Sequence, residues 1–133
     1  MSRGDRLLVF TGAAVGTAIR YASFRIWFHR PGTFPATTLV VNALGAFVLG
    51  VLVVVIAERA DARRWHWFAR VGVLGGFTTF SAYAVEVAQY WRDNAIAVGV
   101  VYAVAMSTLG IVAAFAGLHF GRHFAPRRRE IVR

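Results

Sequence analysis

The chain has 133 residues, of which 58% are hydrophobic and only six are acidic, too few for the polar exterior that a water-soluble domain of this size needs. Its fifteen basic residues are all arginine and give a net charge of +9. The chain contains no cysteine, and this excludes disulfide bonds, thiolate metal sites and thiol nucleophiles.

Four hydrophobic segments are expected to cross a membrane, at about residues 6–28, 37–57, 68–90 and 95–120. A transmembrane helix needs about 20 apolar residues, and the runs Leu39–Ala57 and Ala95–Leu118 contain no charged residue. The connections are short, which predicts antiparallel neighbours. We therefore predict an all-α integral membrane protein with one transmembrane domain, residues 1–133, and a basic tail at 121–133.

The first segment carries Gly12 and Gly16, a pair of small residues whose spacing favours close helix packing in membranes. Arg20 stands late in the same segment, beside Tyr21. Its guanidinium either extends to the lipid headgroups or sets a positive potential at the mouth of a pore. The sequence leaves both interpretations open.

The second segment contains Asn42, a lone amide inside an apolar run. Burying an amide without hydrogen-bond partners costs about 1–3 kcal/mol. Asn42 is therefore expected either to bond another helix or to face a polar pathway. Gly45 and Gly50 add small surface to the same segment, which favours close packing.

The third segment contains residues that weaken a helix, since Gly72, Gly75 and Gly76 precede Thr78 and Thr79. Interrupted backbone inside a membrane must be buried in protein or line a wet cavity, because lipid offers it no hydrogen-bond partners. A broken third helix is therefore predicted, and such a break indicates a binding or conduction element. The alternative is that the glycines serve only close packing.

Phe80, Tyr83 and Glu86 follow at helical spacing and share one helix face. Aromatic residues in such a stripe usually pack, but their ring edges carry partial positive charge and suit a small, hard anion. Glu86 is the only acidic residue within a predicted segment, which makes it a candidate for function. Its place near a helix end also allows the carboxylate to reach water.

The fourth segment places the hydroxyl groups of Tyr102, Ser107 and Thr108 in the membrane, where each can bond a carbonyl one turn earlier. The four histidines lack metal-site spacing. The sequence shows no Ser-His-Asp set, phosphate loop or pair of carboxylates. It therefore predicts that the protein is not an enzyme.

The arginines are unevenly distributed between the two sides of the membrane. With four spans both termini share one side, which receives Arg3, Arg6, Arg59, Arg63, Arg64, Arg70, Arg122, Arg127, Arg128, Arg129 and Arg133, whereas the other receives Arg20, Arg25, Arg30 and Arg92. The positive-inside rule then predicts cytoplasmic termini in a multi-pass protein of the cell membrane. The expected anionic partner of these arginines is membrane lipid, not nucleic acid.

Three stretches of the sequence carry a resemblance: Gly12–Tyr21 (GAAVGTAIRY), Thr38–Gly50 (TLVVNALGAFVLG) and Gly75–Glu86 (GGFTTFSAYAVE). Together they resemble the Fluc, or CrcB, fluoride channel family, and the match extends over all four segments. The resemblance implies passive, fluoride-selective efflux that lowers cytoplasmic fluoride and confers fluoride resistance. It also implies an antiparallel, dual-topology dimer with two narrow pores along its interface and a central structural sodium ion.

The resemblance also assigns roles to single residues. The backbone carbonyls of Gly75 and Thr78 correspond to the sodium ligands. The implied pore residues are Asn42, Phe80, Ser81, Tyr83 and Tyr102, and Tyr83 stands where the family usually has a second phenylalanine. Arg20 matches a vestibule arginine, and we place Glu86 with it.

Alternatives to a self-sufficient channel remain. The bias in loop arginines predicts one fixed orientation, whereas a chain that inserts both ways needs nearly balanced loops. The dimer is therefore either a homodimer or a heterodimer with an oppositely oriented paralogue, in which this chain is an obligate-partner or non-conducting subunit. A more distant alternative is a small proton-coupled cation exporter, for which Glu86 would be the central carboxylate.

Overall fold

The computed structural model describes residues 1–26, 34–57, 59 and 61–124. Residues 27–33 and, of the predicted basic tail at 121–133, residues 125–133 lie outside the described residues, whereas residues 121–124 are helical. The described part contains four helical segments long and apolar enough to cross a membrane: Arg3–Ile26, Ala36–Ala57, Ala62–Arg92 and Ile96–Phe124. The prediction of an all-helical, multi-pass membrane protein is therefore confirmed.

Three of the spans are single helices: α1 (Arg3–Ile26), α2 (Ala36–Ala57) and α6 (Ile96–Phe124). The remaining span consists of α3 (Ala62–Trp65), the π-helix η1 (His66–Val73), α4 (Leu74–Phe77) and α5 (Phe80–Arg92). This span begins at Ala62, well before the predicted residue 68. Arg63 and Arg64 are exposed and arginine is a good helix former, so the helix starts before its apolar part does.

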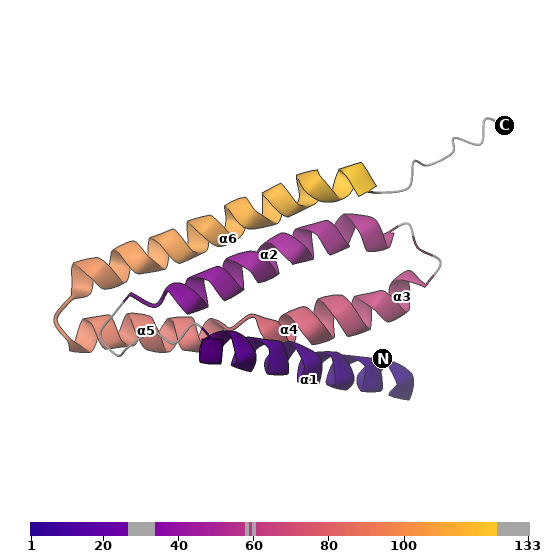
Figure 1. Ribbon diagram of the computed structural model, residues 1–133, viewed down its shortest axis with the longest axis horizontal. Coiled ribbons are helices and arrows are strands. Elements are labelled where there is room, and N and C mark those ends of the chain that lie inside the picture. The colour runs from indigo at the N-terminus through magenta and orange to yellow at the C-terminus, as the bar shows by residue number, and fades with distance from the viewer. Residues whose placement is uncertain (27–33, 58, 60, 125–133) are drawn as a thin grey trace.

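The spans associate as two pairs, which Figure 1 shows side by side. The yellow to orange helix α6 packs along α2, and α1 packs along η1 and α4. The helix α5 continues past the end of α1 and lies against α6. The third span thus belongs to one pair through its first half and to the other through its second half.

Small residues form the seam within each pair. A Cβ atom added to Gly16 of α1 would overlap the carbonyl oxygen of Val73, and one added to Gly117 of α6 would overlap the carbonyl oxygen of Phe47. Without side chains between them, the backbones approach closely enough for extensive van der Waals contact, the main attraction between helices in lipid. The close packing predicted for Gly12 and Gly16 is confirmed, since both are buried against the third span.

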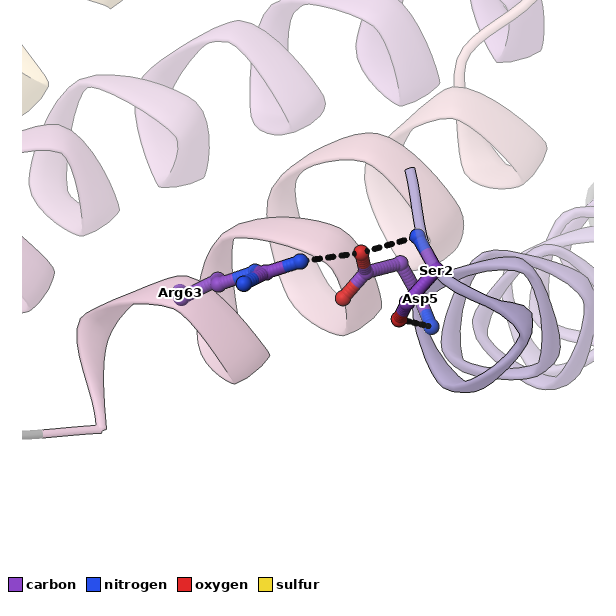
Figure 2. A network of polar contacts seen from close by, with 3 residues as sticks. All are labelled: Ser2, Asp5 and Arg63. Atoms are coloured by element: carbon purple, nitrogen blue, oxygen red, sulfur yellow. Dashed lines mark hydrogen bonds and ion pairs between the residues drawn. The ribbon is translucent and has the colours of Figure 1, made fainter.

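The start of α1 is tied to α3 by the network in Figure 2. The backbone N–H of Ser2 donates to Oδ2 of Asp5 at 2.7 Å, and the backbone N–H of Asp5 donates to Oγ of Ser2 at 3.1 Å. Arg63 donates through Nη2 to the same carboxylate oxygen at 2.6 Å. The network caps the first turn of α1 and neutralises a buried carboxylate.

Candidate functional site

The backbone between α4 and α5 is extended at Thr78 and Thr79. Thr78 has ψ of 157°, and Thr79 has φ of −144° and ψ of 112°, whereas Phe77 ends α4 and Phe80 begins α5. The hydroxyl of Thr79 accepts a hydrogen bond from the backbone N–H of Ala82 at 3.1 Å, which caps the N-terminus of α5. The irregular backbone thus lies at the Thr78–Thr79 pair.

Asn42 of α2 pairs with the backbone of Thr79 through both ends of its amide. Its Nδ2 donates to the carbonyl oxygen of Thr79 at 3.0 Å, and its Oδ1 accepts the backbone N–H of Thr79 at 2.8 Å. The side chain thereby satisfies backbone groups that no helix satisfies and that lipid cannot. Of the two possibilities the sequence left open, Asn42 bonds to another helix, and it also lines the groove described next.

A groove of about 470 Å³ runs beside the irregular backbone. It is lined by Asn42, Gly45, Ala46, Leu49, Arg70, Leu74, Gly75, Thr78, Thr79, Phe80, Tyr83, Met106 and Ser107. One N–H of the Asn42 amide is bonded to Thr79, and at Nδ2 the only other contact among the described residues is the weak acceptor Sδ of Met106, 4.0 Å away. The groove therefore offers one amide donor that is only weakly engaged.

A second polar cluster lies at the middle of α5. Glu86 accepts hydrogen bonds on both carboxylate oxygens, from the hydroxyl of Thr38 at 2.5 Å and from that of Tyr102 at 2.6 Å. Thr38 is 0% exposed and Tyr102 is 1% exposed. A carboxylate bound by two buried hydroxyl groups is held inside the bundle and is not merely extended to water.

Aromatic rings connect the groove with this cluster. The ring centroids of Phe80 and Tyr83 are 5.5 Å apart, and those of Tyr83 and Tyr102 are 5.9 Å apart. Phe80 is 79% exposed and lines the groove, whereas Tyr102 is buried beside Glu86. The rings of Phe80, Tyr83 and Tyr102 therefore form a row from the groove to the cluster, and Asn42 lines the groove in which that row begins.

The remaining predicted site residues differ in whether they line the groove. Ser81 is exposed and within hydrogen-bond distance of the Thr79 hydroxyl, at 3.2 Å, but it does not line the groove. Arg20 lies on α1, and neither Arg20 nor Glu86 is among the residues that line the groove. Gly75 and Thr78, the predicted sodium ligands, both line it.

The sequence interpretation missed three residues of the site. Thr38 stands one helical turn before Asn42, and this spacing alone would have placed its hydroxyl on the same helix face. Thr79 was seen as a helix-weakening residue, not as the partner of Asn42. Arg70 was counted with the arginines on the side of the termini, near the start of the predicted segment 68–90, and was not considered as a residue of the groove that it lines.

Comparison with known proteins gives a consistent result. Residues 7–118 match the model of a family described as CrcB-like protein, Camphor Resistance (CrcB). A relative named fluoride-specific ion channel FluC 2, from Nitrobacter hamburgensis, is 38% identical over 119 residues, which cover 88% of this chain and 96% of the relative. The FluC of Agrobacterium fabrum is 39% identical over 87% of this chain and 94% of its own length. FluC 1 of Streptomyces coelicolor is 42% identical over 80% of this chain and 70% of its own length.

Proposed function

The chain belongs to the CrcB family of ion channels, and from this premise we propose that it is a fluoride-selective channel through which fluoride leaves the cytoplasm passively. As a member of a channel family it is not an enzyme. The observation that carries the proposal is the pairing of Asn42 with Thr79, which stabilises irregular backbone beside a groove inside the membrane-spanning part.

The proposed path begins in the groove. Fluoride is small and strongly hydrated, so it enters a narrow pore only where protein donors replace its water. The weakly engaged N–H of Asn42 is one such donor, and the positive ring edges of Phe80 and Tyr83 are others. These groups are donors to anions and not to cations, which supports selection by charge.

The path continues at the hydroxyl groups of Thr38 and Tyr102. Both already donate to an anion, the carboxylate of Glu86. Fluoride can take these donors only when the carboxylate rotates away, because two negative charges at hydrogen-bond distance repel. Glu86 is therefore proposed to hold the two donors in place while no fluoride is present.

We also propose a structural sodium ion at Gly75 and Thr78. Both residues line the groove, and the backbone hydrogen bonds outside the helices of the described part include none that ends at either carbonyl. Free carbonyl oxygens suit a hard cation. Bound there, sodium would supply positive charge to backbone oxygens that are otherwise unsatisfied in the membrane.

A dimer is proposed because the path is incomplete in one chain. Phe80 is 79% exposed and the groove it lines opens at the surface of the bundle, where an apolar ring and polar backbone groups would meet lipid together. A second chain, inserted with the opposite orientation, would cover them. The excess of arginine on the side of the termini favours cytoplasmic termini for this chain and an oppositely oriented paralogue as its partner, although a homodimer satisfies the same geometry.

Fluoride efflux from liposomes that contain only the purified chain tests the proposal, with a fluoride electrode as the detector and chloride as the control ion. We expect rapid loss of fluoride with retention of chloride. If the folded chain releases no fluoride alone but does so after co-reconstitution with a paralogue, it is an obligate-partner subunit. Absence of fluoride release in both experiments would refute the channel.

A further inference from the structure

Arg70 lies in η1, within the third span, and lines the groove together with Asn42 and Gly75. Its backbone lies on the order of 10 Å along the helix from Ala62, the first residue of the span. Among the described residues that line the groove, Arg70 is the only charged one. The groove therefore contains a fixed positive charge inside the membrane-spanning part.

The described residues leave this charge unpaired. Nε of Arg70 is buried and has no hydrogen-bond partner. The ion pairs in the described part of the chain, Arg59 with Asp61 and Arg63 with Asp5, do not include it. A buried donor of a charged group without an acceptor costs at least about 1–3 kcal/mol, and a charge at membrane depth adds to this cost.

Two neighbouring polar side chains in the groove are already engaged in other hydrogen bonds. Oδ1 of Asn42 accepts the backbone N–H of Thr79, and the hydroxyl of Ser107 donates to the carbonyl of Ala103 at 2.9 Å. The groove is large enough, at about 470 Å³, to admit an ion that keeps part of its hydration. A negatively charged ion in the groove would neutralise the guanidinium, and a small shift of the Arg70 side chain would bring Nε within hydrogen-bond distance of that ion.

We propose that Arg70 binds a small inorganic anion in the groove and that, given the proposed function, this anion is fluoride on its way to Asn42. A guanidinium attracts every small anion, so Arg70 concentrates ions at the groove and leaves discrimination to the Asn42 amide and the ring edges. Loss of Arg70 therefore lowers occupancy of the groove without changing which ion is preferred.

The test uses fluorine-19 NMR of sodium fluoride added to the purified full-length chain, because exchange with a protein site broadens the fluoride signal. Arg70→Gln removes the charge inside the groove. Arg64→Gln is the matched control, since Arg64 is exposed, lies in the same span and lines a different pocket. Circular dichroism and gel filtration verify that each variant is folded.

We expect Arg70→Gln to reduce the protein-dependent broadening about tenfold, in the range by which a focused charge changes local ion concentration, while Arg64→Gln leaves it unchanged. Equal broadening in the wild type and Arg70→Gln would overturn the proposal and indicate that the guanidinium extends to water or lipid. An equal loss of broadening in Arg70→Gln and Arg64→Gln would also overturn the proposal, because the net charge of the protein would then explain the broadening without a site at Arg70.

A second variant keeps the test decisive if Arg70→Gln does not fold. Arg70→Lys retains the charge but has no Nε donor, and we expect it to bind fluoride more weakly than the wild type and retain the same ion preference. Binding identical to the wild type would contradict the role of Nε. The readout needs no transport, so a chain that binds fluoride through Arg70 but releases none from liposomes would refute the channel and not the anion site.

Discussion

The two halves of the third span are held in opposite ways. The first half, η1 and α4, is packed against α1, where Gly72 and Gly76 meet the backbone of α1 without intervening side chains. All residues of the second half, α5, are described, and none of them is fully buried. Polar bonds hold it instead, through the Thr79 cap at its start and Glu86 at its middle.

This difference separates structural from functional demands within one span. Packed glycine seams are rigid and dry, and they offer an ion nothing to bind. Hydrogen bonds to hydroxyl groups, amides and carboxylates can be exchanged for bonds to an ion. We infer that the glycine seam of the first half fixes the position of the site, while Arg70 and Gly75 reach the groove from that half and the second half supplies the exchangeable hydrogen bonds. Substitutions in the seam and in the polar bonds should therefore fail in different ways.

The largest effect is expected from Gly16→Ala, because the added Cβ would overlap the carbonyl oxygen of Val73 and force α1 away from the third span. Overpacking of this kind costs about 3 kcal/mol or more when backbone atoms must move. The fraction of folded protein after gel filtration and its resistance to denaturation measure the effect. Gly110→Ala is the control, since a Cβ there has no atom within 4 Å. Equal stability of the two variants would contradict the claim that Gly16 is needed for close packing of α1 against the third span.

A smaller but still large loss is expected from Asn42→Ala, which removes both hydrogen bonds to the Thr79 backbone. We expect a loss of stability of about 2–3 kcal/mol, the sum of the two bonds and of the donor left unsatisfied, together with loss of fluoride efflux. Ser107→Ala, in the same groove, removes only a bond within α6 and should change stability by less than about 0.5 kcal/mol. Similar stabilities for both variants would show that the break does not depend on Asn42.

The polar cluster of α5 is tested by a double-mutant cycle with Glu86→Gln and Tyr102→Phe. We expect a coupling energy of about 1.5–3 kcal/mol for the hydrogen bond to a charged acceptor. Each single substitution should reduce fluoride efflux while the protein remains folded, in contrast to Gly16→Ala. Additive effects in the unfolding measurement would mean that the bond between Glu86 and Tyr102 contributes nothing.

The smallest effect is expected from Tyr83→Phe. The rings on either side of Tyr83 stay in place, and no hydrogen bond of its hydroxyl is among those of the described residues. Stability should therefore change by less than about 0.5 kcal/mol, and fluoride efflux should be nearly unchanged. A large loss of efflux with intact folding would show that the hydroxyl, and not only the ring edge, contacts the ion.

Hydropathy predicted the spans well, because a bilayer demands long apolar helices whatever their tertiary contacts. Glycines followed by the β-branched Thr78 and Thr79 were the local pattern from which a break in the third helix was predicted. The pairing of Asn42 with Thr79 was not, since it joins residues on different helices and no local pattern encodes it. The role of Arg70 in the groove was not visible for a related reason, since the residues with which it lines the groove come from other helices as well as from its own.

The glycine seam between α1 and the third span has a consequence for how the chain is synthesised. α1 makes few contacts with α2, the helix that follows it from the ribosome, and its main partners, η1 and α4, are made later. The first two helices therefore enter the membrane without a stable interface between them. The glycine face of α1 meets lipid until the third span is inserted, so assembly of this bundle cannot proceed helix by helix and must wait for residue 77 or beyond.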